Sequence, residues 1–142
     1  METLGEFAPA TPEAVADRFE ALGPVAQTVT KEVAKAMEFD AEEYRSRVTS
    51  DVVETAREAL FASLLEVHVG TRAEFESAVE ASDYEVVERG HPDVERVVWH
   101  VADAADTVVA ATFAEEQAAA VGTLRRQAFG EVYRDLLGLD DE

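Results

Sequence analysis

The sequence predicts an α+β fold in which an N-terminal helical layer is followed by a β-α-β-β-β-α segment with a mostly antiparallel sheet covered by helices. Two observations carry this prediction. Apolar residues recur at helical spacing over about residues 12–64, and strand patterns alternate with helical ones over about residues 65–137. The chain is 47% hydrophobic, which suffices for a single domain with one core over residues 1–142. We expect the helices to pack on one face of the sheet.

Local start signals mark the first four helices. A Thr-Pro pair suits an N-cap and first turn, a Gly-Pro pair separates two helices, and a capping box combines an N-cap acceptor with a later Glu. These signals stand at Thr11-Pro12, at Gly23-Pro24, at Asp40 with Glu43, and at Ser50 or Asp51. The apolar positions at helical spacing are Val15, Phe19 and Leu22, then Val29, Val33 and Met37, then Tyr44 and Val48, and finally Val53, Ala56, Leu60 and Leu64. We expect Val29, Val33 and Met37 to be buried.

Four segments after residue 64 are expected to be strands. In "LLEVHVG" the apolar residues alternate with Glu66 and His68, as in a half-buried strand. "YEVVERG", "VERVVWHVA" and "TVVAATF" are rich in β-branched residues and separated by turn signals, so we expect a meander. Within the second of these, Val97, Trp99 and Val101 share the apolar face, which places the single tryptophan in the core.

Two further capping boxes are expected to open the helices of this second part. Thr71 with Glu74, in "TRAE", precedes a helix with apolar residues on one side. Thr112 with Glu115 is expected to open the terminal helix. The residues that this terminal helix is expected to bury are Val121, Leu124, Ala128, Val132 and Leu136.

Charge is the most distinctive feature of the composition. Asp and Glu number 31 against 12 Lys and Arg, and the formal net charge is -19. Apolar periodicity runs through nearly the whole chain, which argues against disorder as the explanation. A folded domain this acidic repels itself in dilute buffer, whereas in molar salt the Debye length falls to about 3 Å and the repulsion is screened. We therefore expect a protein that requires the high KCl of a halophile's cytoplasm; the alternative is an acidic protein with a basic partner.

Several classes of function lack their sequence signals. The chain has no cysteine, which removes disulfides, zinc–thiolate sites and cysteine nucleophiles. No apolar run reaches the roughly 20 residues of a membrane span, and the acidic N-terminus is unlike a signal peptide. Phosphate-binding loops and nucleophile elbows are absent, and no carboxylate is singled out as a general acid or base. We expect a cytoplasmic protein without membrane contact, cofactor or catalytic residue.

Residues 24–48 have the outline of a helix-turn-helix, the DNA-reading pair of helices. Their cations Lys31, Lys35, Arg45 and Arg47 are outnumbered by five carboxylates. A recognition helix here would bring two glutamates of its first turn toward phosphates, where base contacts are normally made. We therefore expect two amphipathic helices that pack on their neighbours, and nucleic-acid binding is the disfavoured alternative.

A second group of cations lies on the terminal helix. Arg125, Arg126 and Arg134 accompany a single acid, Glu131, so this segment is locally positive. Guanidinium groups bind carboxylates or phosphates through paired hydrogen bonds, and glutamates of other elements are the expected partners. The candidate ligand or partner contacts are Arg125, Arg126, Arg134, Lys31, Lys35 and Arg45.

Two histidines are weak candidates for metal ligands. His68 and His100 lie opposite the apolar residues of two predicted strands, and their rings could meet if these strands are neighbours. Glu66 or Asp103 would then complete a site. The sequence lacks the usual metal-binding spacings of His and Glu, so we expect both histidines to face solvent and no metal to bind.

Four segments carry a resemblance to a known family. "FEALGP", "KEVAKAMEFDAEEY", "RVVWH" and "TLRRQAFGEVYRDLL" together resemble a small family of uncharacterised haloarchaeal proteins, over nearly the whole chain. None of these segments is a catalytic signature, and the family has no assigned activity. The resemblance therefore implies a source and no site residue.

Three functional hypotheses follow. The first is a non-catalytic domain that acts through protein–protein contacts, with a partner protein or as a homodimer, and it predicts a large exposed apolar patch. The second is a nucleic-acid-associated regulator, which predicts that Lys31, Lys35, Arg45, Arg47 and Arg125 converge on one face. The third is an enzyme with an unrecognised site, which predicts a deep pocket with titratable groups of shifted pKa.

Overall fold

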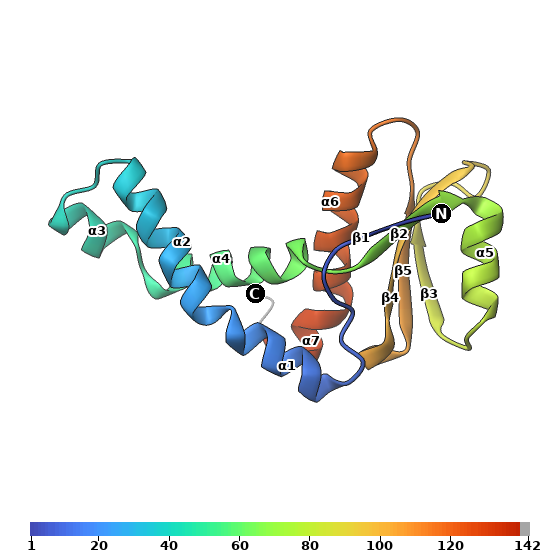
Figure 1. Cartoon of the computed structure of the whole chain (residues 1–142), viewed down its shortest axis with the longest axis horizontal. Helices are drawn as coiled ribbons and strands as arrows, with labels where there is room; N and C mark the ends of the chain where they lie inside the picture. The colour runs from blue at the N-terminus through green and yellow to red at the C-terminus, as the bar shows by residue number, and fades with distance from the viewer. Residues whose placement is uncertain (140–142) are drawn as a thin grey trace.

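A computed structural model describes residues 1–139 (Figure 1). The helices are α1 (Pro12–Ala21), α2 (Gly23–Ala36), α3 (Ala41–Arg47), α4 (Ser50–Ser63), α5 (Arg72–Glu80), α6 (Gln117–Ala128) and α7 (Arg134–Leu136). The strands are β1 (Glu2–Leu4), β2 (Val67–Thr71), β3 (Glu85–Arg89), β4 (Arg96–Ala102) and β5 (Thr107–Thr112). A 3-10 turn, Asp103–Ala105, joins β4 to β5, and a π-helical turn, Phe129–Tyr133, joins α6 to α7. The predicted α+β class is confirmed.

The five strands form one sheet in the order β1-β2-β4-β5-β3. All neighbours are antiparallel except β3 and β5, which are parallel. The predicted meander is therefore wrong, because β3 pairs with β5 and not with β4. Four consecutive residues of β4, Val97–His100, are buried, which is typical of a central strand covered on both faces. Strands β2 and β5 take the two edges of β4, so β3 is left at the outer edge of β5.

Helices cover both faces of this sheet, and the prediction of one covered face is wrong. On one face Val69, Val98 and Val109 join the main core with residues of α4 and α6. On the other face Trp99 packs against Phe75 of α5, with 5.4 Å between ring centroids. The reason is that β4 is apolar on both faces, so each face needs its own cover.

Three predicted helix starts are confirmed by hydrogen bonds. The Thr11 hydroxyl accepts from the backbone N–H of Ala14 at 3.1 Å, directly before α1. Asp40 with Glu43 and Thr71 with Glu74 form complete capping boxes, before α3 and α5 respectively. Each of these signals acts within one turn of chain, so distant contacts do not overrule it.

Of the two other predicted starts, the first is wrong and the second is confirmed. Thr112 ends β5, where its hydroxyl accepts from the backbone N–H of His91 at 3.1 Å, and α6 begins only at Gln117. α4 begins at Ser50, as predicted, and its N-cap is Thr49, whose hydroxyl accepts from the backbone N–H of Val52 at 3.3 Å. In the first case the sheet contact takes the side chain that the capping box would need.

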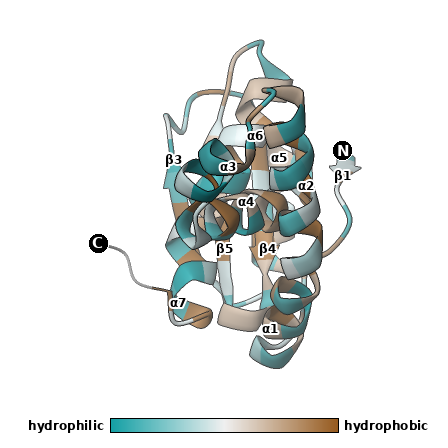
Figure 2. Cartoon of the chain, turned by 90° about the vertical axis from the view of Figure 1, so that its left-hand side faces the viewer, coloured by the Kyte–Doolittle hydropathy of each residue, from teal (hydrophilic) through white to brown (hydrophobic). Residues whose placement is uncertain are grey.

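The helices α2 and α3 project from the rest of the molecule together with the first part of α4 (Figure 1). We call residues 23–59 the arm and the remainder of the described chain the body. Figure 2 looks onto the tip of the arm, with α3 in front of α2 and α4. Phe61 of α4 joins arm to body, because its fully buried ring lies in the main core. The rings around Phe61, at centroid distances of 5.2, 5.9, 5.7 and 5.2 Å, belong to Phe7, Phe19, Phe129 and Tyr133.

Candidate interaction surface on the helical arm

Helix α2 turns its small residues toward α4 and its large apolar residues outward. Ala26, Thr30 and Ala34, spaced four residues apart, are buried where α2 packs along α4. A second stripe with the same spacing is exposed, by 44% at Val25, 38% at Val29, 51% at Val33 and 59% at Met37. The prediction that Val29, Val33 and Met37 are buried is therefore wrong. Small side chains let two helices approach closely, and the larger stripe is left on the adjoining side.

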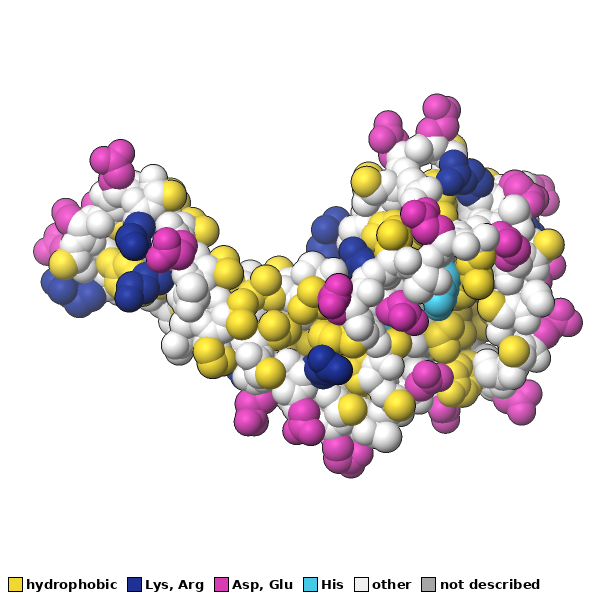
Figure 3. Space-filling model, in the orientation of Figure 1, with side chains coloured by type: hydrophobic (Ala, Val, Ile, Leu, Met, Phe, Trp, Pro, Cys, Tyr) yellow, Lys and Arg dark blue, Asp and Glu magenta, His cyan; other side chains and the backbone are white. Residues whose placement is uncertain are grey.

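Beside this packed seam runs a groove of about 390 Å³, which we call the apolar groove. Its lining residues are Val29, Thr30, Val33, Ala34, Met37, Phe39, Arg47, Val48, Val52, Thr55, Ala56 and Ala59. Among these described residues there is no acid and one cation, Arg47, although 31 of the 142 residues of the chain are acidic. Figure 3 shows hydrophobic side chains along the arm, and Asp and Glu at its tip and over the body. The groove thus lacks the carboxylates that are frequent elsewhere in the chain.

The opposite side of the same helix pair mixes polar and apolar residues. It holds a hollow of about 470 Å³ whose lining includes Gln27, Thr28, Lys31, Thr49 and Ser50. Thr30 and Val48 line both hollows, which places the two hollows on either side of α2 and α4. A nearly continuous apolar lining is therefore found on one side of the arm, whereas the other hollow combines its polar residues with Pro24, Tyr44 and Val53.

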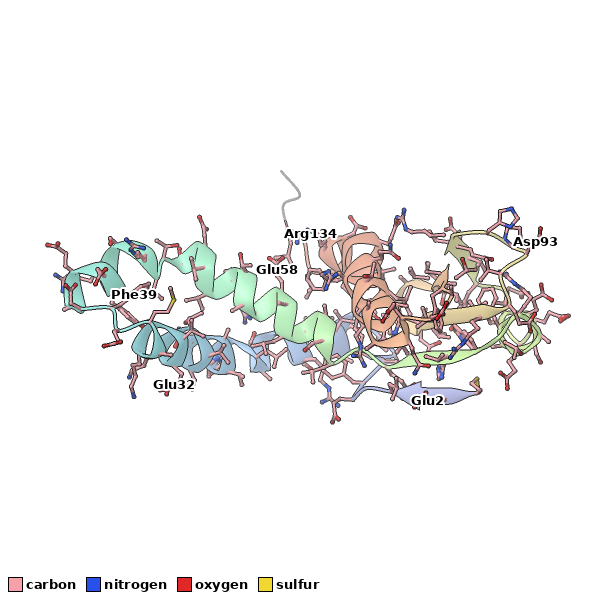
Figure 4. All side chains as sticks on the ribbon, turned by 90° about the horizontal axis from the view of Figure 1, so that it is seen from above. Glu2, Glu32, Phe39, Glu58, Asp93 and Arg134 are labelled. Carbon is pink, nitrogen blue, oxygen red and sulfur yellow. The ribbon has the colours of Figure 1, made fainter. Side chains whose placement is uncertain are left out.

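The chain reversal after α2 places an aromatic ring at the tip end of the groove. The backbone N–H of Phe39 donates to Ala34 O at 3.1 Å and that of Glu38 donates to Lys35 O at 3.0 Å, which is a Schellman motif. Glu38 takes the left-handed conformation, with φ 59°, that this motif requires. Phe39 then lies at the tip of the arm (Figure 4), with the guanidinium of Arg47 5.5 Å from its ring centroid.

The cations predicted as partner contacts are divided between arm and body. Lys31 and Lys35 lie on α2 and Arg45 on α3, all exposed, and Lys35 forms an ion pair with Glu32 at 3.5 Å. Arg125 lies on α6 in the body, where its Nε donates to the backbone carbonyl of Leu65 at 2.9 Å. Burial lowers the pKa of this guanidinium. These candidate cations thus come from three different helices, α2, α3 and α6.

The other two predicted arginines also lie in the body. Arg126 of α6 donates to the hydroxyl of Thr123 on the same helix at 3.5 Å. Arg134 forms an ion pair with Glu58 of α4 at 2.5 Å, and Figure 4 shows the two side chains next to one another. This ion pair ties α7 to the base of the arm.

His68 and His100 do not meet, although β2 and β4 are neighbours. His68 stands opposite Trp99 in the register, so His100, one residue further along, points to the other face of the sheet. His68 lies beside the Trp99 ring and hydrogen-bonds the Thr3 hydroxyl at 2.9 Å. His100 is completely buried, so the expectation that it faces solvent is wrong. Within residues 1–139 no three His, Asp or Glu side chains are grouped as a metal site.

His100 belongs instead to a buried hydrogen-bond chain in the main core. Its Nδ1 lies 2.6 Å from the backbone carbonyl of Glu66, which can only accept, so Nδ1 carries the proton. Its Nε2 therefore accepts from the Tyr133 hydroxyl, also at 2.6 Å. Burial lowers the pKa of His100 to about 4 against the opposing effect of the Glu66 carbonyl, and burial raises the pKa of Tyr133. Both side chains are fully enclosed, so a substrate has no access to them.

Comparison with known proteins adds a family. No curated protein and no solved structure gives a significant match. Among residues 1–139 no helix is both long and apolar enough to cross a bilayer. One family model matches residues 6–134, a stretch that includes the whole arm, the buried histidine and every helix up to α6. Since the match covers nearly the whole chain, the protein belongs to this family, a family of unknown function (DUF5809).

Proposed function

We propose that this protein is a non-catalytic domain of a halophile's cytoplasm that acts through protein–protein contact, and that the apolar groove is its contact surface. The observation that carries the proposal is the stripe of large side chains exposed along α2, beside a groove without acids. Contiguous apolar surface of this kind marks an interaction site in a soluble protein more often than it marks ordinary surface.

The groove suits binding in concentrated salt. In molar KCl the Debye length is about 3 Å, so contacts between exposed charges are weak. Burial of apolar surface contributes roughly 25 cal/mol per Å² and does not depend on such charges. A protein with a net charge of -19 that must bind in high salt is therefore best served by a surface with few charges. The arm provides this surface, whereas carboxylates are distributed over the body (Figure 3).

The first prediction tests the groove as a contact surface. Val33→Glu places a carboxylate among the groove residues, and we expect the tagged variant to lose the protein that co-purifies with the wild type in molar KCl. The matched control is Val86→Glu, because Val86 is also an exposed valine, at 37%, but lies on the edge strand β3 of the body. The control is expected to keep the bound protein.

Two results would count against the proposal. If Val33→Glu retains every protein that binds the wild type, the groove is not the contact surface. If nucleic acid, detected by the ultraviolet absorbance ratio, co-purifies with the wild type in molar KCl, the regulator hypothesis replaces the proposal, and the cations Lys31, Lys35 and Arg45 become the residues to substitute.

A further inference from the structure

We infer that the occupant of the apolar groove is the arm of a second copy of this chain, so that α2 and α4 of two copies form a four-helix bundle about a two-fold axis. This inference rests on the proposed function and names its partner. It is carried by three features of the arm: its thickness, the sizes of its side chains and its charge.

The arm is a single layer of helices. α2 and α4 pack on one another through the buried stripe of Ala26, Thr30 and Ala34, and the large apolar residues beside this stripe have no second layer over them. Helices in globular proteins bury an apolar stripe against another layer of structure. A pair of helices needs one further pair to complete the four-helix arrangement that is common in soluble proteins.

The two helices of the arm differ in side-chain size in a way that suits a second copy. On the groove side α2 presents Val29, Val33 and Met37, whereas α4 presents Val52 in its first turn and then the smaller Thr55, Ala56 and Ala59. A two-fold axis across the arm lets the large residues of α2 in each copy fit over the small residues of α4 in the other. Such a contact is isologous, since the same surface serves both subunits and no other surface is used.

Charge favours contact between arms over contact between bodies. The arm carries five cations and eight carboxylates, so most of the net charge of -19 belongs to the rest of the chain. Like charges brought together at an interface raise its free energy, and the groove residues include no carboxylate. Because the arm projects from the body, two arms can pair while the acidic bodies stay apart (Figure 1).

The first test is the mass of the purified chain in molar KCl, measured by light scattering. We expect the wild type to have twice the 15.5 kDa of one chain. Val33→Glu and Met37→Glu are expected to be monomers, and the body variant Val86→Glu is expected to stay a dimer. Val33 and Met37 are both more than half exposed, so these substitutions leave the fold intact, which circular dichroism checks.

The second test locates the interface with spin labels. The chain has no cysteine, so a single introduced cysteine takes a single label. Thr28→Cys labels the middle of α2 and Ser77→Cys labels α5 in the body, both at exposed positions. In a dimer of arms, the distance between the two labels at position 28 is expected to be shorter than the distance between those at position 77.

The outcomes separate this inference from the proposed function. A monomeric wild type, a dimer that survives both groove substitutions, or labels that are closer at position 77 would each overturn the inference. If the wild type is a monomer while Val33→Glu loses a different bound protein, the proposed function stands without the second copy. If the wild type is a monomer and Val33→Glu loses nothing, both fail.

Discussion

At the scale of single residues, the buried His100 couples folding to pH. In the unfolded chain a histidine has a pKa of about 6.5 and binds a proton below that pH. In the folded protein burial lowers the pKa of His100 to about 4, so the ring stays neutral between these values. The unfolded state therefore binds one more proton than the folded state, and the free energy of unfolding falls as the pH falls from 6.5 toward 4.

This difference gives a prediction for His100→Gln. A glutamine amide can still donate to the Glu66 carbonyl and accept from Tyr133, but it does not titrate. The linkage is worth about 1.4 kcal/mol per pH unit, so between pH 7 and 5.5 the wild type is expected to lose about 1 kcal/mol of unfolding free energy that the variant keeps. Urea unfolding at several values between pH 7 and 5.5, where most carboxylates stay ionised, measures the two slopes.

The matched control for that experiment is His91→Gln, because the side chain of His91 is 67% exposed in the loop between β3 and β4. This control is expected to keep the pH dependence of the wild type. Equal slopes for wild type and His100→Gln would show that His100 does not account for the acid sensitivity. The charged groups that act on His100 are unchanged in both variants. His68 and Arg125 lower the pKa of His100, and Asp103 raises it.

At the scale of elements, α2 ends in a Schellman motif that places Glu38 in an unfavourable backbone conformation. Glu38 has φ 59°, and a left-handed conformation costs a residue with a Cβ roughly 1–2 kcal/mol. Glycine avoids this cost, but it loses more conformational entropy on folding, which costs roughly 0.5–1 kcal/mol. We therefore expect Glu38→Gly to raise the free energy of unfolding by about 0.5–1 kcal/mol, measured by urea titration.

The control for Glu38→Gly is Glu38→Ala, which removes the same carboxylate and keeps the Cβ. If glycine stabilises the fold by removing the cost of the left-handed conformation, the alanine variant is no more stable than the wild type. The difference in the free energy of unfolding between the two variants then measures that conformational cost. If both variants are stabilised equally, loss of a negative charge in this acidic chain is the cause, and the argument from the Schellman motif fails.

Features decided within one element could be predicted from the sequence, whereas contacts between elements could not. The caps at Thr11, Asp40 and Thr71 were predictable because a cap is decided within one turn of helix. The place of β3 was not predictable, because it depends on which strands pair with the two edges of β4, and those strands are distant in the sequence. The groove was missed for a related reason: an apolar stripe is normally assigned to the interior, and only the small residues Ala26 and Ala34 indicate that another side of α2 faces its neighbour.

At the scale of the whole molecule, shape and charge act together. An acidic body with a projecting arm has its carboxylates spread over a larger surface than a sphere would offer, and the aromatic cluster around Phe61 holds arm and body in one core (Figure 1). The strength of that core is opposed by the repulsion among carboxylates. Salt weakens the repulsion among carboxylates far more than it changes the packing of the core. The free energy of unfolding is therefore expected to rise with ionic strength.

The last prediction concerns that dependence. The Debye length falls from about 10 Å at 0.1 M to about 3 Å at 1 M salt, so most of the screening occurs below molar concentration. With a net charge of -19, the melting temperature is expected to rise steeply with KCl at first and then to level off. Salts that act by exclusion from the protein surface give a steady rise instead, without a plateau. Thermal unfolding over a KCl series distinguishes the two curves, and a melting temperature that rises only in proportion to concentration would show that repulsion among these carboxylates is not what limits the stability of the fold.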